Sequence, residues 1–174
     1  MIIINTGDGK GKTTAAVGQV IRSLGRGYKV CIIQLFKGKE FYGEQLVLKK
    51  LKNLKFYSFA PKHPGCFRDT DPKLVRKDCL KALDKFGEVL KGKPRYDLIV
   101  LEEFNIALRD GYLKVNELLK VLDKSYLNNN KIHVIITGRA APKALLEAAD
   151  LVTEMKEVKH PYNKGMVATK GIEF

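Results

Sequence analysis

The sequence predicts one α/β domain over residues 1–174, with a mainly parallel sheet and helices on both of its faces. Apolar runs typical of buried strands alternate with segments of helical periodicity along the chain, which indicates parallel strands joined by helical crossovers. The connections are short, with no linker-like or low-complexity segment. A length of 174 residues with 45% hydrophobic residues is enough for one packed core.

The predicted strands are short β-branched and aliphatic runs, often bounded by glycine or charged residues. The first is MIIIN at the start of the chain, and the second is KVCIIQLF. All six lie at residues 1–5, 29–36, 54–59, 96–103, 131–138 and 151–159. Nearly continuous apolar character, as in the first two, is typical of strands buried on both faces of a sheet.

The predicted helices have apolar residues at intervals of three and four. They lie at residues 12–24, 44–51, 71–91, 114–125 and 141–149. Gly25 and Gly27 are expected to end the first of them. Asp71 is the expected N-cap of the third helix, with Pro72 at its first helical position.

The charge and cysteine content exclude several classes of protein. The net charge is +13, but the lysines are scattered and form no compact basic block, so we expect no nucleic-acid partner. A polyphosphate ligand, an acidic protein partner and a simple solubilising surface all remain compatible with this charge. Cys31, Cys66 and Cys79 lack the spacing of a disulfide framework or a zinc site, and Cys31 is expected in the core.

Two further features bear on location. The sequence contains no run of about 18 apolar residues, so we expect no membrane span. It begins MIIIN, without the basic region and cleavage site of a signal peptide, so we expect a cytoplasmic protein.

A glycine-rich segment, TGDGKGKTTAA at residues 6–16, connects the first predicted strand to the first helix. Its glycines, Gly7, Gly9 and Gly11, let backbone N–H groups approach phosphate oxygens at the helix N-terminus. Lys12 adds a positive charge, and the Thr13 hydroxyl is a ligand for Mg²⁺. The segment departs from the usual phosphate-binding loop because Thr6 stands at the first glycine position.

Charged residues follow two of the other predicted strands. Glu102 and Glu103 end the strand at 96–103, and Arg139 follows the strand at 131–138. Carboxyl ends of parallel strands share one edge of the sheet, so these residues are expected beside the phosphate loop. A carboxylate there can hold a metal, and an arginine there can bind phosphate. A surface strand end and a surface or helix-capping arginine are the structural alternatives.

The residues alone therefore predict an Mg-ATP-binding protein that hydrolyses ATP or transfers a phosphoryl group. Periodicity makes Arg22 a solvated helix residue. His160 has no metal-ligand spacing to His133 or His63, so we expect no histidine metal site.

Several motifs together resemble those of the P-loop type ATP:corrinoid adenosyltransferases. The matching segments are TGDGKGKTTAAVG, YDLIVLEEFNIAL, VIITGRAAPKALLEAADLVTEMKEVKHPYNKG and the ending KGIEF, and they extend from the first strand to residue 174. The family's loop, G-[ND]-G-K-G-K-T-T, lacks the same first glycine. The resemblance implies a single P-loop NTPase (RecA-like) domain.

The resemblance also implies a particular reaction. Family members transfer the 5′-deoxyadenosyl group of Mg-ATP to cobalt in the Co(I) state of a corrinoid, and triphosphate leaves in one piece. ATP binds across the loop in a sense reversed from ordinary P-loop enzymes. The implied partners are a second copy of the chain, in a homodimer, and a flavoprotein reductant. A P-loop ATPase or small-molecule kinase is the alternative, and a regulatory ATP-binding module is a third possibility.

The resemblance assigns roles residue by residue. The expected catalytic residues are Lys12, Glu103 and Arg139, and the expected metal ligands are Thr13, Glu102 and Glu103. The expected ATP-binding residues are Gly7, Asp8, Gly9, Lys10, Gly11, Lys12, Thr13, Thr14 and Arg22. Asp8 replaces the commoner asparagine, and Glu102 replaces an aspartate that is one methylene shorter.

The corrinoid-binding residues are harder to assign because the family uses aromatic residues that include tryptophan, and this sequence has none. Phe59 and Phe67, which flank APKHPGC, are the expected substitutes, together with His160. Phe59 has a structural alternative as a core residue. Pro61 and Pro64 are expected to stiffen the loop between the two phenylalanines.

Overall fold

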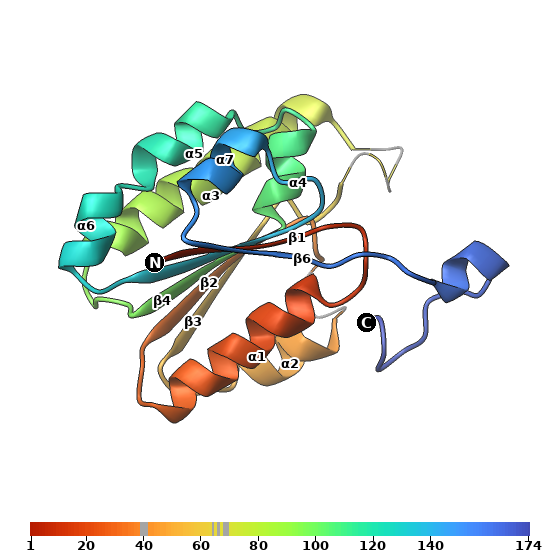
Figure 1. Cartoon of the computed structure of the whole chain (residues 1–174), viewed down its shortest axis with the longest axis horizontal. Helices are drawn as coiled ribbons and strands as arrows, with labels where there is room; N and C mark the ends of the chain where they lie inside the picture. The colour runs from red at the N-terminus through yellow and green to blue at the C-terminus, as the bar shows by residue number, and fades with distance from the viewer. Residues whose placement is uncertain (39–41, 64, 66, 68–69) are drawn as a thin grey trace.

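A computed structural model of the chain describes residues 1–38, 42–63, 65, 67 and 70–174. In this part of the chain, six parallel strands form one sheet in the order β3-β2-β4-β5-β1-β6 (Figure 1). The strands are β1 Ile2–Thr6, β2 Val30–Leu35, β3 Leu54–Phe59, β4 Leu98–Glu102, β5 His133–Thr137 and β6 Leu151–Glu154. The predicted parallel α/β architecture is confirmed.

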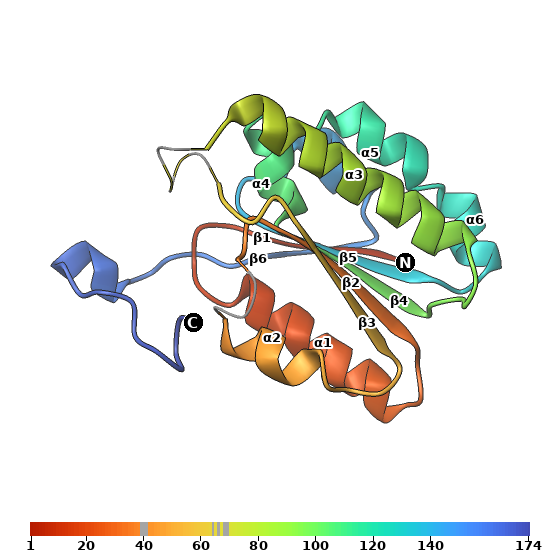
Figure 2. The ribbon, with the colours of Figure 1, turned by 180° about the vertical axis from the view of Figure 1, so that it is seen from behind.

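Helices cover both faces of this sheet, as predicted. The helices are α1 Lys12–Gly25, α2 Gly43–Leu48, α3 Pro72–Lys91, α4 Phe104–Arg109, α5 Val115–Val121, α6 Lys124–Asn129, α7 Lys143–Ala148 and a 3-10 turn, η1, Pro161–Lys164. The first two lie on one face, and α3 to α7 lie on the other, which the view from behind shows equally well (Figure 2). None of the described helices combines the length and apolar character that a membrane span requires.

The core divides between the two faces because successive side chains of a strand point in opposite directions. In β2, Cys31 and Ile33 belong to the larger cluster under α3, whereas Val30 and Ile32 pack with α1 and α2. Cys31 is fully buried, as predicted. Cys66 lies outside the described residues.

The helix prediction for residues 114–125 was wrong, because two helices occupy this region. The chain leaves helical geometry at Leu122, and the Asp123 carboxylate then accepts a hydrogen bond from the Tyr126 amide to start α6. Helix α4, directly after β4, was not predicted. The late strand is also shorter than expected and ends at Glu154 rather than at residue 159. In contrast, Asp71 caps α3 as predicted and accepts from the Lys73 amide.

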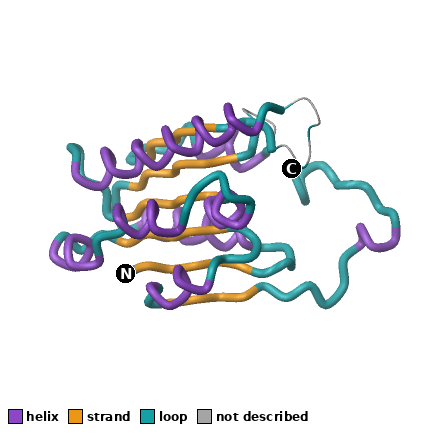
Figure 3. Tube along the Cα trace, turned by 90° about the horizontal axis from the view of Figure 1, so that it is seen from above, coloured by secondary structure: helices purple, strands orange, loops and turns teal. Residues whose placement is uncertain are grey.

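The carboxyl ends of the strands face the segment that follows β6. Seen from above, this segment leaves the sheet beyond that edge and then turns back towards it (Figure 3). The phosphate-loop sequence, the ends of β4 and β5, and the last residues of the chain are thereby brought to one side of the molecule.

Candidate functional site

A pocket of about 570 Å³ opens at the carboxyl ends of the strands. It brings together the predicted residues Asp8, Gly9, Lys10, Gly11, Lys12, Thr13, Thr14, Glu103, Arg139 and His160. Elements distant in sequence thus meet at the edge where parallel α/β sheets bind ligands.

The loop between β1 and α1 is held against the chain that continues from β6. The Gly9 amide donates to the Met155 carbonyl at 2.7 Å. A Cβ at Gly7 would lie 2.4 Å from that carbonyl oxygen, and one at Gly9 would lie 2.7 Å from the Lys156 carbonyl carbon. Gly7 also has a φ of +95°, which side-chain-bearing residues rarely adopt. Glycine at these two positions therefore allows the loop to pack on the segment after β6.

Thr6, the departure from the usual loop sequence, is still part of the sheet. It pairs with Glu154 of β6, and its carbonyl accepts from the Met155 amide at 2.8 Å. Its hydroxyl accepts from the Ala141 amide at 3.1 Å. Thr6 therefore needs no glycine-like freedom, and its side chain fixes the connection between β5 and α7 that carries Arg139.

Four cationic side chains line the pocket: Lys10, Lys12, Lys37 and Arg139. The Lys12 ammonium donates to the Gly9 carbonyl at 2.6 Å. Burial and the nearby Arg139 guanidinium lower the pKa of Lys12 and outweigh the opposing effect of Glu103. A bound polyphosphate would relieve this repulsion, so the arrangement favours an anionic ligand.

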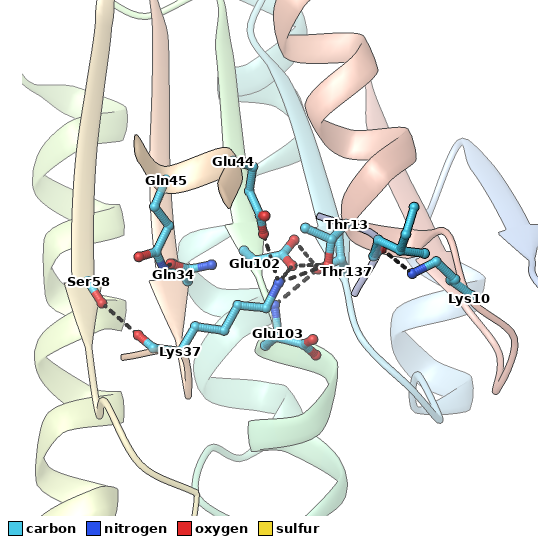
Figure 4. A network of polar contacts seen from close by, with 11 residues as sticks. Lys10, Thr13, Gln34, Lys37, Glu44, Gln45, Ser58, Glu102, Glu103 and Thr137 are labelled. Carbon is cyan, nitrogen blue, oxygen red and sulfur yellow. Dashed lines mark hydrogen bonds and ion pairs between the residues drawn. The ribbon is translucent and has the colours of Figure 1, made fainter. Parts of the chain in front are cut away.

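Glu102, at the end of β4, is 3% exposed and lies between Thr13, Lys37 and Thr137 (Figure 4). One carboxylate oxygen accepts from the Thr13 hydroxyl at 2.5 Å and from the Lys37 ammonium at 3.0 Å. The other accepts from the Thr137 hydroxyl at 2.5 Å. Burial by itself would lower the pKa of Lys37, but the carboxylates of Glu102 and Glu103 outweigh it and raise that pKa. The ammonium and the Glu102 carboxylate therefore form a buried ion pair.

Glu103 begins α4 with a φ of +63°, a left-handed conformation that is uncommon for a glutamate. Its amide donates to the Thr137 hydroxyl at 3.0 Å, which fixes the turn. Its Oε2 is buried and has no hydrogen-bond partner in the described chain. Burial, reinforced by the neighbouring Glu102 carboxylate, raises the pKa of Glu103 from 4.5 to about 7.

Glu103 is expected to make the ligand-free chain less stable as the pH rises. The folded pKa of about 7 exceeds the ordinary 4.5, so this group's stabilisation is complete below pH 4.5 and is lost as the pH rises through about 7. The Glu103→Gln variant should lack this fall, which we expect to be on the order of 1–3 kcal/mol. Urea unfolding between about pH 5 and about pH 8 measures it. Parallel pH profiles for the two proteins would contradict the assignment.

The donor set at the end of β4 suits a hard cation. The described residues contain no group of three His, Cys, Asp or Glu side chains able to hold a metal by themselves. The Thr13 hydroxyl and the Glu102 carboxylate are nevertheless in direct contact, and Glu103 has a buried oxygen without a partner. Mg²⁺ in nucleotide sites takes only one or two protein oxygens and obtains the others from phosphates and water. These residues therefore fit Mg²⁺ that is bound together with a nucleotide.

Some predicted site residues lie elsewhere. Arg22 is exposed, does not line the pocket and donates to Gln19 at 3.2 Å. Phe59 is partly buried and packs against the larger core cluster, so it follows the alternative prediction of a core residue. Phe67 is 44% exposed. His160 lines the phosphate-loop pocket, whereas Phe59 and Phe67 do not line it.

Sequence reasoning missed several residues of the pocket. Lys37, Tyr42 and Glu44 also line it, as do residues 171–174. The Lys10 ammonium donates to the Ile172 carbonyl at 2.6 Å, which holds the chain end over the loop. The sequence did contain a signal for Lys37. Like Glu103 and Arg139, this residue lies at the carboxyl end of a predicted buried strand.

Comparison with known proteins identifies the family of this chain. The family model for "ATP:corrinoid adenosyltransferase BtuR/CobO/CobP" matches residues 1–174. The chain belongs to this family. The corrinoid adenosyltransferases, which transfer the adenosyl group of ATP to cobalt corrinoids, include relatives at 38% identity in Pseudomonas aeruginosa and at 35% in a Sinorhizobium species. All of this chain is matched in both, as are 83% and 80% of the two relatives.

Solved structures confirm the fold of this corrinoid adenosyltransferase family member. The flagellar accessory protein FlaH from Methanocaldococcus jannaschii superimposes with a TM-score of 0.55 at 17% identity, over 88% of this chain and 69% of FlaH. A KaiC-like protein, PH0186 from Pyrococcus horikoshii, has a TM-score of 0.51 at 14% identity, over 91% of this chain and 73% of its own. At such identities the similarity concerns the P-loop NTPase-like fold alone.

Proposed function

We propose that this corrinoid adenosyltransferase uses Mg-ATP and a corrinoid in the Co(I) state, and that it releases triphosphate in one piece. The observation that supports this most directly is the pairing of Lys12 and Arg139 in one pocket beside the glycine loop. Two cations there would stabilise the negative charge that grows on a departing triphosphate.

The proposed reaction requires few other functions of the protein. Co(I) is itself a strong nucleophile, and its electron pair forms the Co–C bond as the bond from C5′ to the triphosphate oxygen breaks. No proton has to be removed, so no general base is required. The pocket has to align C5′ with cobalt and to hold the triphosphate.

We propose that Thr13, Glu102 and Glu103 hold the magnesium ion that accompanies ATP. When bound, the ion would offset part of the charge of the triphosphate. Gly11 and Thr14 are proposed to contact phosphate oxygens, whereas Gly9, whose amide donates to the Met155 carbonyl, is proposed to hold the loop in shape. Arg22 lies outside the pocket, so in this proposal it acts only through a contact that the single chain does not make.

The test is to identify what ATP becomes. The protein is incubated with ATP, Mg²⁺ and chemically reduced Co(I) corrinoid, and the products are separated by ion-exchange chromatography. We expect triphosphate and an adenosylated corrinoid in equal amounts. ADP would favour an ATPase or small-molecule kinase, and unchanged ATP would favour a regulatory binding module; either result would overturn the proposal.

Assembly, location and electron supply are proposed as well. We propose that the protein is a cytoplasmic homodimer that receives electrons from a flavoprotein, as its membership of the family suggests. The basic surface, with a net charge of +13, would steer an acidic reductant towards the protein.

Phe67 is proposed to support reduction of the corrinoid. An apolar wall against the lower face of the corrinoid would exclude the axial ligand of Co(II) and so ease reduction to Co(I). Phe67 is exposed enough to meet a ligand, although the Lys62 ammonium lies 5.4 Å from its ring centroid. Of the two prolines predicted to stiffen this loop, Pro64 lies outside the described residues.

The Phe67→Ala variant is expected to lose about tenfold or more in activity when Co(II) corrinoid and a weak flavin reductant are supplied. It should lose little when pre-reduced Co(I) corrinoid is supplied. Comparing the two assays separates reduction from transfer. Equal losses in both would mean that Phe67 positions the substrate or supports the fold.

A further inference from the structure

Lys37 is a buried lysine to which neither the sequence motifs nor the proposed function assigns a role. It follows β2, is 8% exposed and reaches the ends of α1 and β4 (Figure 4). Its carbonyl accepts from the Ser58 hydroxyl at 3.3 Å, which ties its backbone to β3. Lysine is rarely buried unless it is paired, so this placement calls for a specific set of partners.

Those partners are the groups that would bind the metal. The Lys37 ammonium lies 3.0 Å from the Thr13 hydroxyl oxygen and 3.0 Å from Glu102 Oε1. The hydroxyl and the carboxylate are themselves 2.5 Å apart. A divalent cation bound to the same two oxygens would therefore have to take the place of the ammonium.

Two further groups near the Lys37 ammonium can attract its positive charge. Glu44 Oε1 lies 3.6 Å from it, and the Tyr42 ring centroid lies 4.9 Å from it. Helix α2, which carries Glu44, is anchored to β2 by a buried hydrogen bond of 2.7 Å between Gln45 and Gln34. The ammonium can thus turn from Glu102 towards Glu44 and the pocket without losing all of its partners.

We propose that Lys37 is the resident cation of the ligand-free site, that it keeps free Mg²⁺ off Thr13 and Glu102, and that it yields this position when the metal arrives bound to ATP. The proposal rests on the proposed role of Mg-ATP. The phosphates bring several negative charges, so they can accommodate both the metal and the displaced ammonium. Lys37 is a positioning residue: it makes metal binding depend on the nucleotide.

The test uses neither ATP nor corrinoid, so its outcome is independent of whether the chain transfers adenosyl groups. Binding of Mn²⁺, as a spectroscopic substitute for Mg²⁺, is measured by electron paramagnetic resonance. We expect Lys37→Met to bind Mn²⁺ about tenfold or more tightly than the wild-type chain, because the competing charge is gone. Lys37→Arg, which keeps a positive charge, should bind as weakly as wild type.

Thermal unfolding gives a second readout. In EDTA, Lys37→Met should unfold at a lower temperature than wild type, because the buried Glu102 carboxylate lacks its partner. Mg²⁺ should restore much of this loss, while the wild-type chain responds little. Lys55→Met is the matched control, because Lys55 is an exposed lysine on β3 outside the pocket and its loss should leave both measurements unchanged.

The proposal can be tested even if the Lys37→Met variant fails to fold. The double variant Lys37→Met/Glu102→Gln has no uncompensated carboxylate at Glu102 and should fold in EDTA without binding Mn²⁺. If Lys37→Met folds only with Mg²⁺ present, the proposal is supported. If it fails with and without Mg²⁺ while the double variant folds, or if it folds and gains no metal affinity, Lys37 is a purely structural ion-pair partner and the proposal is wrong.

Discussion

Replacing Lys12 by alanine is expected to slow adenosyl transfer by about 10²–10³-fold, the loss typical of one preorganised electrostatic donor. The Lys12 ammonium lies against the glycine loop, 2.6 Å from the Gly9 carbonyl. Its pKa is lowered by burial and by Arg139, so a polyphosphate that pairs with it removes an unfavourable interaction. In the variant, the departing triphosphate would lose the charge that lies against the glycine loop, and Arg139 would remain as the other predicted catalytic cation of the pocket.

Single-turnover transfer to chemically reduced Co(I) corrinoid measures this effect without the reductase step. Lys55→Ala serves as the control, since it removes a lysine from the exposed side of β3. Thermal unfolding of both variants shows whether the fold is intact. A transfer rate for Lys12→Ala close to that of the control would remove the assignment of residues 6–16 as the phosphate-binding loop.

Replacing Gly7 by alanine is expected to weaken ATP binding by about 10²-fold and to destabilise the fold by about 1–3 kcal/mol. The added Cβ would lie 2.4 Å from the Met155 carbonyl oxygen and 2.9 Å from the Met155 amide nitrogen. Both atoms belong to the backbone, so no flexible side chain can move aside. The φ of +95° adds strain for any residue with a Cβ. The loop has to shift, and the amide groups that face the phosphates shift with it.

Gly18→Ala is the matched control for this substitution. Gly18 lies in α1 with nothing within 4 Å of its added Cβ, and alanine in a helix interior stabilises by up to about 1 kcal/mol relative to glycine. Calorimetric titration with ATP and urea unfolding compare the two variants. Equal ATP affinity and stability in both would show that the contact between the loop and Met155 does not shape the site.

The sequence by itself determined the fold class and the position of the glycine-rich loop between β1 and α1. Strands and helices alternate with clear periods, and Asp71 with Pro72 marks the start of α3, because these signals depend only on neighbouring residues. The same local logic predicted that Lys12, Glu103 and Arg139 would meet, since carboxyl ends of parallel strands share one edge. It was wrong for residues 114–125, where apolar periodicity continues across a break that the Asp123 cap introduces.

Only the tertiary structure decided what surrounds those residues. Lys37 meets Glu102 because β2 and β4 are neighbours in the sheet, and no local pattern specifies which strands adjoin. The rise in the pKa of Glu103 and the fall in that of Lys12 come from burial and from charges on other elements, which a linear sequence does not contain. The packing of the glycine loop on Met155 has the same origin. These are long-range effects, and they depend on distances that exist only after the chain has folded.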